Sequence, residues 1–335
     1  MSNSDFGEKP MTLRANAAGS DMLLAIWREF ESGKLAHAYL FTGEKGVGKK
    51  TFSNVLAKAI LCQAEGDKPC GNCRSCKRFE SKTHGNVYYP VPQAKKTTIG
   101  VDDLRNILDE LSRASLDGGR RVIVIHNAEK MTPASQNCLL KTLEEAPEGV
   151  FFLLVTDMER AILPTIRSRC RVVRISPWHP DRILRTLTEK GVSQSRAREL
   201  TDLCEGSIGK ALQMLDDEGY WTDRELVRKT FLNVRRVADV PAASQLLKDK
   251  KDDADRLLQI LEQELRLFIS QIAQNSRDEH GFFPEQWKAA DVQSLCRIQD
   301  AVLKCKQYRL SNVGWAANAE NLMMKIAEEA RKWQQ

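Results

Sequence analysis

A glycine-rich turn followed by lysines is the first part of this 335-residue sequence with the residue types for chemistry. Residues 43–50 read G-E-K-G-V-G-K-K, between a short apolar run and a stretch with helical spacing. Such glycines let backbone amides curl around phosphate oxygens, and Lys49 would pair with the β- and γ-phosphates. The pattern predicts a phosphate-binding loop, or P-loop, with the candidate residues Gly43, Gly46, Gly48, Lys49, Lys50 and Thr51.

This P-loop departs from the pattern of an ATPase at two places. The residue after Lys49 should carry a hydroxyl that ligates Mg²⁺, but Lys50 presents an ammonium that repels a dication. Thr51 is no simple substitute, because the next helical residue points about 100° around the axis. A later apolar strand is followed by His126 and Asn127, where an ATPase needs an acid. We expect no ATP hydrolysis, and two interpretations remain: an ATP site, or a scaffold with weak or absent nucleotide binding.

Four of the nine cysteines have the spacing C-x7-C-x2-C-x2-C, and they are Cys62, Cys70, Cys73 and Cys76. Four thiolates this close fit a closed tetrahedral Zn²⁺ site, which is structural because no ligand position is left open. A [4Fe–4S] cluster is one alternative, but its fourth cysteine usually lies downstream with a proline, whereas here it lies upstream. Free reduced thiols are the other alternative. The remaining cysteines are scattered and expected in the core: Cys138, Cys170, Cys204, Cys296 and Cys305.

The elements that must position these residues alternate between strand and helix in the first half of the chain. Continuous β-branched or aromatic runs at 121–125 and 150–155 predict strands that are buried on both faces of a parallel sheet. Shorter strands are predicted at 38–42, 87–89 and 171–175. Helical spacing is found between them at 51–61 and 133–145. After Pro177 the patterns are helical only, at 182–190, 195–203, 208–215, 253–272 and 318–333.

These patterns predict three domains, with boundaries uncertain by several residues. An α/β domain covers 1–176 and carries the cysteine module at about 62–76, a small helical domain covers 177–218, and an all-helical domain covers 219–335. No apolar run approaches the roughly 20 residues of a membrane span, and the first twenty residues lack the apolar core of a signal peptide. We therefore expect a cytoplasmic protein. Its net charge of +6 is compatible with nearby nucleic acid but establishes no such partner.

Several stretches together resemble the bacterial clamp-loader AAA+ subunits over almost the whole chain. They are the four-cysteine insertion, H-A-Y-L-F-T-G at 37–43, T-I-G-V-D-D-L-R at 98–105, N-C-L-L-K-T-L-E-E-A-P at 137–147 and L-P-T-I-R-S-R-C at 163–170. The resemblance implies an AAA+ P-loop domain with an inserted zinc module, a small helical lid domain and an all-α collar domain. The departures at Lys50 and His126 and the presence of Gly209, where the family has an ATP-sensing arginine, indicate a non-hydrolysing member.

The resemblance also gives Arg169 a role and the chain its partners. In the family the tripeptide S-R-C, here 168–170, supplies an arginine finger that completes the ATP site of a neighbouring subunit. The alternative is that Arg169 merely caps a surface helix. The implied partners are gamma/tau and delta subunits in a pentameric ring, the sliding clamp (beta) and primer–template DNA, with no membrane. Thr156 matches the family's sensor position.

Other classes of function stay open at this point. One is a ring-forming ATPase, for instance a degenerate gamma-type subunit, in which Lys49 binds nucleotide and a remote acid holds Mg²⁺. Another is a zinc-dependent DNA-binding protein with a relic P-loop. Its basic face would be formed by Lys45, Lys49, Lys50, Lys95 and Lys96, although such charges are more often a solvated surface.

Overall fold

The structure is a computed structural model that describes residues 12–17, 20–92, 96–112, 119–273, 287–311 and 314–333. The chain divides into two compact units. The first unit comprises Met1–Gly191 and Glu205–Lys210, and the second comprises Val192–Cys204 and Ala211–Gln335. The predicted three-domain division, with boundaries after 176 and 218, stays a prediction. Every helix in the described ranges is too short or too polar to span a bilayer.

The first unit contains a five-stranded parallel sheet with the strand order β2-β3-β4-β1-β5. Its strands are β1 (Ala38–Thr42), β2 (Val87–Tyr88), β3 (Arg121–Ile125), β4 (Val150–Val155) and β5 (Arg171–Arg174). Each lies within a run from which a strand was predicted, and β2 and β5 each end one residue early. Because all strands are parallel, their carboxyl ends lie along one edge of the sheet. The residues that follow β1, β3 and β4 therefore come together there.

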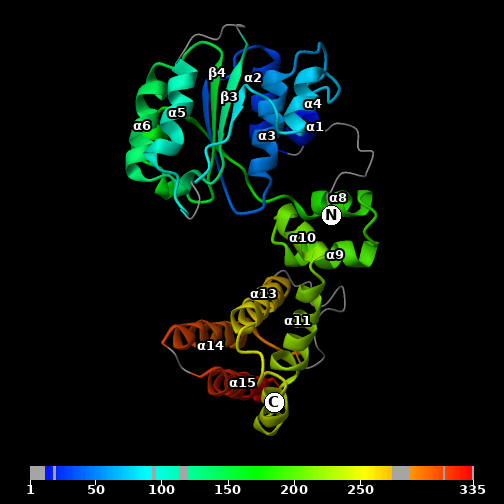
Figure 1. Ribbon diagram of the computed structural model, residues 1–335. Coiled ribbons are helices and arrows are strands. Elements are labelled where there is room, and N and C mark those ends of the chain that lie inside the picture. Colours follow the sequence, from blue (N-terminus) through cyan, green and yellow to red (C-terminus); the bar gives the residue numbers. More distant parts are fainter. Residues whose placement is uncertain are drawn as a thin grey trace. The chain divides into compact units, whose positions relative to one another are not determined.

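Helices cover both faces of this sheet (Figure 1). On one side lie α1 (Leu13–Ala17), α2 (Asp21–Glu31), α3 (Lys49–Leu61) and α4 (Arg74–Glu80). On the other side lie α5 (Val101–Ser112) and α6 (Pro133–Glu144), with the short α7 (Pro164–Arg167) packed against α6. The helix α8 (Pro180–Glu189) and the first residues of α10 (Ile208–Asp216) also belong to this unit.

Alternation along the strands produces two apolar cores. Tyr39 and Phe41 of β1 point into the core beneath α1, α2 and α3, where the Phe41 and Phe52 rings lie 5.6 Å apart. Ala38 and Leu40 point into the opposite core with residues of α5, α6 and α7. Strands buried on both faces explain the unbroken apolar runs of the sequence, because neither face can tolerate a polar residue.

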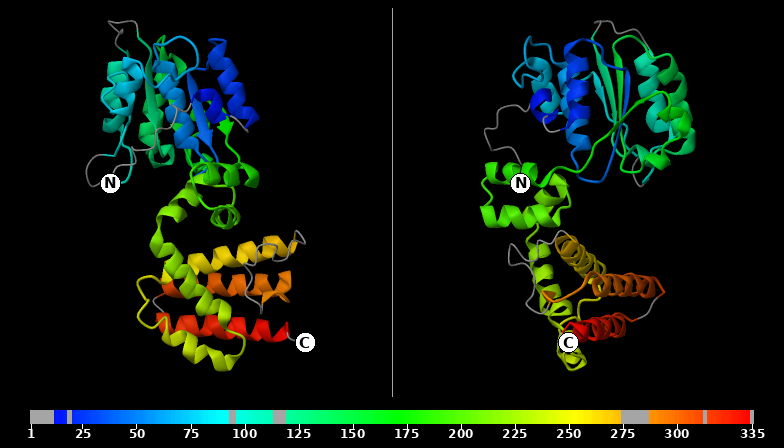
Figure 2. Two further views of the ribbon diagram at one scale, coloured as in Figure 1. Left: turned by 90° about the vertical axis from the view of Figure 1, so that its right-hand side faces the viewer. Right: turned by 180° about the vertical axis from the view of Figure 1, so that it is seen from behind.

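The second unit is helical throughout its described residues. Its helices are α9 (Gln194–Leu203), the rest of α10, α11 (Glu218–Lys229), α12 (Val240–Gln245), α13 (Ala254–Ala273), α14 (Val292–Leu310) and α15 (Trp315–Lys332). Figures 1 and 2 show α13, α14 and α15 lying side by side. The sheet and the helical C-terminal region confirm the predicted fold class, an α/β AAA+ P-loop domain followed by helical regions.

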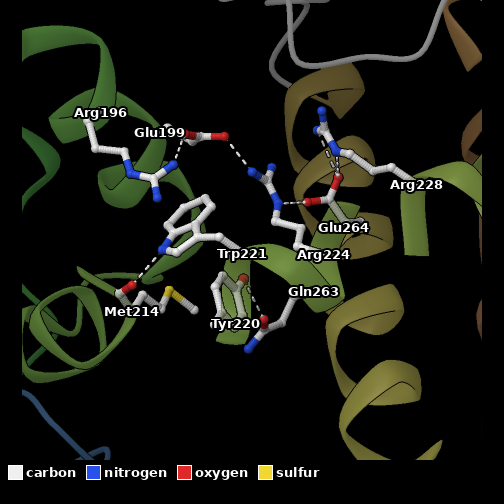
Figure 3. A network of polar contacts seen from close by, with 9 residues as sticks. All are labelled: Arg196, Glu199, Met214, Tyr220, Trp221, Arg224, Arg228, Gln263 and Glu264. Carbon is white, nitrogen blue, oxygen red and sulfur yellow. Dashed lines mark hydrogen bonds and ion pairs between the residues drawn. The ribbon is translucent and has the colours of Figure 1, made fainter. Parts of the chain in front are cut away.

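A network of buried charges joins α9, α11 and α13 within the second unit (Figure 3). Arg224 of α11 donates to Glu199 of α9 and to Glu264 of α13, and the side chains of Arg224 and Glu264 are 5% and 0% exposed. Arg228 also donates to Glu264, with 3.0 Å between Nη2 and Oε2. Burial alone would lower the pKa of Arg224, but the two carboxylates outweigh it and raise that pKa. The network joins three helices through the buried charges of Arg224 and Glu264 and the partly exposed charges of Glu199 and Arg228.

The first prediction concerns the centre of this network. Replacing Glu264 by alanine leaves the buried Arg224 charge with one carboxylate fewer, so the free energy of unfolding should fall by about 3–5 kcal/mol. Urea unfolding followed by circular dichroism measures this change. The matched control is Glu225→Ala, because Glu225 pairs with Lys229 on the exposed face of α11. That variant should stay within about 0.5 kcal/mol of the wild-type chain. A Glu264→Ala effect as small as that of the control would contradict the prediction.

Candidate functional site

The glycines of the P-loop are required by its backbone. Gly43, Gly46 and Gly48 have φ angles of +141°, +84° and +99°, a region that other residues rarely adopt. A Cβ atom at Gly43 would also collide with the carbonyl oxygen of Ile175, which follows β5. The predicted loop therefore forms between β1 and α3, and Lys49, Lys50 and Thr51 make up the first turn of α3.

Lys49 is buried, and oxygen atoms of its own chain surround its ammonium group. Its Nζ atom lies 2.7 Å from the carbonyl oxygen of Gly43 and 2.7 Å from Oδ1 of Asp157, and it also donates to the carbonyl oxygen of Glu44. The Lys49 side chain is only 3% exposed. An ammonium has three N–H donors, so these three acceptors satisfy it completely. Asp157 thus supplies the negative charge that a phosphate would bring to a working P-loop lysine.

The place where a P-loop enzyme binds Mg²⁺ carries a positive charge here. Nζ of Lys50 donates to Oδ1 of Asn127 at 2.5 Å, directly after the end of β3. Burial, and then the nearby Lys50 charge, lower the pKa of the neighbouring His126 to about 4. His126 is therefore neutral at neutral pH, and among the described residues nothing hydrogen-bonds to its buried Nε2 atom. This arrangement offers a divalent cation no anionic ligand at the end of β3.

Two carboxylates at this edge of the sheet are candidates for the remote acid of an ATPase. Asp157 follows β4 and is paired with Lys49. Glu129 lies in the short 3₁₀ helix Ala128–Lys130, and its Oε2 atom accepts a hydrogen bond from Thr156 Oγ1 at 2.8 Å. Thr156, at the predicted sensor position, is 1% exposed. Both carboxylates are thus engaged by side chains of the chain itself.

Three donors from residues after the sheet close the P-loop from outside. The hydroxyl of Ser207 donates to the carbonyl oxygen of Lys45 at 3.1 Å, and the backbone N–H of Gly209 donates to that of Gly46 at 2.9 Å. The indole N–H of Trp178 donates to the carbonyl oxygen of Val47 at 3.0 Å. Three residues that follow the sheet in the sequence therefore bind three consecutive carbonyl groups of the P-loop.

Gly209 fits this closed arrangement because it has no side chain. A Cβ atom built on Gly209 would lie 2.9 Å from the carbonyl oxygen and 3.1 Å from the Cα atom of Gly46. Real Cβ atoms essentially never come so close to backbone, so an arginine at this position would force the two segments apart. The hydrogen bond between Gly209 and Gly46 therefore requires a residue without a side chain at position 209.

The four cysteines form a group whose geometry fits a tetrahedral metal ion. All four sulfur atoms lie within 4.8 Å of one another, and the Cys62–Cys73 and Cys70–Cys76 pairs are 3.9 and 4.0 Å apart. Four sulfurs at about 2.3 Å from a central Zn²⁺ would lie about 3.8 Å apart, close to the two spacings found here. Backbone N–H groups of Cys70, Cys73 and Cys76 donate to sulfur atoms of the group. These donors stabilise thiolates, the form that binds metals.

The protonation of the cysteine group is coupled to metal binding. Backbone hydrogen bonds lower the pKa of Cys70. For Cys73, burial acts in the opposite direction, but backbone and thiol hydrogen bonds outweigh it and lower the pKa to about 6. Burial raises the pKa of Cys76 to about 12, so this thiol keeps its proton until a cation binds. A metal must therefore displace protons here, and its affinity rises with pH.

The cysteine group and the P-loop lie at opposite ends of one helix. Lys49 begins α3 and Cys62 caps its end, so about 18 Å of helix separates them at 1.5 Å per residue. Ser75 binds the cysteine module to the end of α3, because its hydroxyl donates to the carbonyl oxygen of Leu61 at 2.7 Å. A metal ion in this group would therefore lie too far away to reach a nucleotide at the P-loop.

Arg169 lies outside both groups, just after α7. Its side chain is 34% exposed, and it is held by two acceptors of its own unit. Nη1 donates to the carbonyl oxygen of Thr165 at 3.0 Å, and Nη2 pairs with Glu144, the last residue of α6. Arg169 thus binds a carbonyl group of the short α7, and both interpretations of its role stay predictions.

Several residues of these sites carry no motif in the sequence. Gln136 of α6 is 2% exposed, and its amide donates to the carbonyl of Ala161 and accepts from the N–H of Leu163, which fixes the start of α7. Asp157 and Ser207 were also missed, because each acts on a partner far away in the sequence. Of the basic face considered as an alternative, Lys95 lies outside the described residues.

Comparisons with known proteins agree with this arrangement. Residues 20–179 match the protein family described as "DNA polymerase III, delta subunit". The chain is 32% identical over 206 residues to DNA polymerase III subunit delta' of Bacillus subtilis, covering 62% of each chain. It is 34% identical over 199 residues to the Escherichia coli subunit delta', covering 58% of this chain and 59% of that protein.

A subunit of a second name, tau, is also similar. The chain is 32% identical over 215 residues to DNA polymerase III subunit tau of Escherichia coli, covering 62% of this chain and 33% of that protein. The matches thus span about three fifths of the length of the delta' relatives and a third of the tau relative. The similarity covers the part of the chain that contains the P-loop, the cysteine group and Arg169.

The second prediction follows from the neutral, buried His126. Its pKa is about 4 in the folded chain and 6.5 as the ordinary value, so the unfolded chain binds more protons between these pH values. This contribution to stability is complete above about pH 6.5 and is lost as the pH falls toward 4, by about 2–3 kcal/mol at most. Urea unfolding between pH 8 and pH 4 should show a smaller loss for His126→Asn than for the wild-type chain. If the free energy of unfolding falls equally with pH in the wild-type chain and in His126→Asn, the prediction is refuted.

Proposed function

We propose, on the premise that residues 20–179 belong to the DNA polymerase III delta-subunit family, that this chain is a delta-prime-type, non-hydrolysing subunit of a clamp loader. It assembles with gamma/tau and delta subunits in the cytoplasm and helps to load the sliding clamp onto primed DNA during replication. It is no ATPase on its own but serves as part of the polymerase III holoenzyme. The similarity to the delta' subunits of Bacillus subtilis and Escherichia coli and to the Escherichia coli tau subunit supports the assignment.

The observation that carries this proposal is the occupied P-loop. Lys49 is neutralised by Asp157, and Lys50 holds its ammonium at the end of β3. An ATP molecule would have to break the Lys49–Asp157 pair, and neither His126 nor Asn127 at the end of β3 would offer its Mg²⁺ an anionic ligand. These contacts support a fixed scaffold over the alternative of a degenerate gamma-type ATPase.

Arg169 is the residue through which such a scaffold acts on ATP. Its own unit contains no competent ATP site among the described residues, so an arginine finger at this position serves a neighbouring subunit. The side chain is accessible enough to do so, with 34% of its area exposed. A guanidinium at a neighbour's γ-phosphate stabilises the charge that develops during phosphoryl transfer.

The helical second unit provides the surface for assembly. We propose that residues from about 219 to the end form the collar that joins the subunits, and that 177–218 form the lid. Large apolar side chains are exposed on the two last helices, namely Val292, Leu303 and Tyr308 of α14 and Met324 of α15. These side chains support contacts with other collars, since apolar groups left in water gain free energy on burial.

The metal of the cysteine group is Zn²⁺, with a structural role. Four cysteine ligands leave no open coordination position, and the spacing of the sulfurs fits a tetrahedral ion. The ion would stabilise the turn between α3 and α4 by cross-linking Cys62, Cys70, Cys73 and Cys76.

The third prediction tests this metal. Elemental analysis of freshly purified protein should find about one zinc atom per chain. Cys73→Ser should lower this content and loosen the module, which limited proteolysis would detect as cleavage between α3 and α4. The matched control is Cys296→Ser, because Cys296 lies outside the group and is exposed, so that the expectation of a core position for it was wrong. Iron with visible absorbance, or no metal at all, would exclude the zinc assignment.

The fourth prediction tests the arginine finger. In a complex reconstituted with gamma/tau and delta subunits of the same organism, Arg169→Ala should lower DNA-stimulated ATP hydrolysis only in part. An arginine finger contributes about 10³-fold at its own site, but the other gamma/tau sites continue. Clamp loading should fall further, if all sites must fire together. Arg169→Lys should not restore activity, because a point charge cannot reproduce the guanidinium fork.

Two controls accompany this experiment. Arg167→Ala removes an arginine of equal exposure, 35%, two residues away, and should leave both activities unchanged. The isolated wild-type chain should neither hydrolyse ATP nor bind a fluorescent ATP analogue at micromolar concentration. Mg²⁺-dependent turnover by the isolated chain would overturn the delta-prime-type assignment in favour of the gamma-type alternative. If the wild-type and Arg169→Ala complexes are equally active at matched assembly, Arg169 is not an arginine finger.

A further inference from the structure

The side chain of Arg169 is already ordered before any neighbour is present. Its two terminal nitrogen atoms are held separately, Nη1 by the carbonyl oxygen of Thr165 and Nη2 by the carboxylate of Glu144. We propose that Glu144 is a positioning residue for Arg169, which fixes the guanidinium in the orientation that meets a neighbouring subunit's γ-phosphate. This inference rests on the proposed role of Arg169 in trans.

The two acceptors belong to elements that are firmly fixed to each other. Glu144 is the last residue of α6, and Thr165 lies in α7. The buried Gln136 of α6 holds the segment before α7 through hydrogen bonds of 3.0 Å to Ala161 and 2.8 Å to Leu163. The position of the guanidinium is therefore set by the packing of α6 and α7, and Glu144 is its charged contact with α6.

The contacts to Thr165 and Glu144 leave most of the guanidinium available. An arginine has five N–H donors, and each of the two acceptors takes one, so three remain for phosphate oxygens. The carbonyl end of α6 also carries a partial negative charge, which favours a cation beside it. Glu144 and the helix end therefore hold the arginine without using up its ability to bind a phosphate.

Glu144 is unsuited to hold the finger back. The pair is accessible to water, with the Arg169 and Glu144 side chains 34% and 48% exposed, and such ion pairs contribute little free energy. A γ-phosphate carries more negative charge than one carboxylate and would win the competition easily. What a weak contact does well is to limit the rotamers of a long side chain before the neighbour arrives. Misplacement of a catalytic group by only about 1 Å can slow a reaction by about 10²-fold.

The closing experiment compares Glu144→Gln with wild-type chain in the reconstituted complex with gamma/tau and delta subunits. The quantity measured is the part of DNA-stimulated ATP turnover that depends on Arg169, which is the wild-type rate minus that of Arg169→Ala. Glu144→Gln should lower the kcat of this part by about 3- to 10-fold and leave the KM for ATP nearly unchanged. Glu144→Asp, which keeps the charge, should restore part of the loss.

A matched control and a double variant separate positioning from a general effect on the fold. Glu145→Gln removes the same charge one residue further along, and Glu145 makes no ion pair with the described residues. It should behave as wild type. Glu144→Gln should change nothing further in an Arg169→Ala chain, because the residue it positions is gone. An equal loss in both backgrounds would show a structural role and overturn the inference.

The remaining outcomes separate this inference from the proposed function. If Arg169→Ala lowers turnover and Glu144→Gln matches wild type, the finger stands and the positioning role is refuted. If Glu144→Gln raises turnover, Glu144 restrains the finger, which also refutes it. If Arg169→Ala and Glu144→Gln both match wild type, the finger itself fails, and the positioning role fails with it.

Discussion

The arrangement of the P-loop in the first unit depends on the ion pair between Lys49 and Asp157, which lies at the carboxyl edge of the sheet. A buried ammonium is costly unless it is paired and hydrogen-bonded, and Lys49 is 97% removed from water within its unit. The pair joins the first residue of α3 to the residue that follows β4, and the carbonyl oxygens of Gly43 and Glu44 complete it. With the lysine satisfied internally, the P-loop is a structural joint that needs no phosphate to be stable.

Several neighbouring features follow from that internal solution. The outer side of the loop is free to bind the residues after the sheet, and Ser207, Gly209 and Trp178 use three of its carbonyl groups. Lys50 can occupy the cation position because no cation is needed there, and its charge helps to keep His126 neutral. A loop with the phosphate-binding pattern thus holds its own chain together, which agrees with the proposed non-hydrolysing role.

The other groups of functional or buried polar residues are likewise held by contacts within their own unit. The cysteine group lies at the far end of α3 and stabilises its own turn, while Arg169 is carried by the packing of α6 and α7. In the second unit, Arg224 and Glu264 form a buried pair that joins α11 to α13. Each site thus depends on a few fixed contacts within one unit.

The sequence by itself determined the strands, most helices, the four-cysteine group that could hold a metal ion, and the presence of Lys50 and His126 where the P-loop pattern predicts a hydroxyl and an acid. These depend on periodicity and spacing over a few residues, which any short stretch displays. Only the tertiary structure revealed Asp157 beside Lys49, Glu144 beside Arg169 and Glu264 beside Arg224, pairs separated by 25 residues or more in the sequence. An exposed or buried carboxylate has no local pattern of its own, because its partner is decided by which helices and strands the fold brings together.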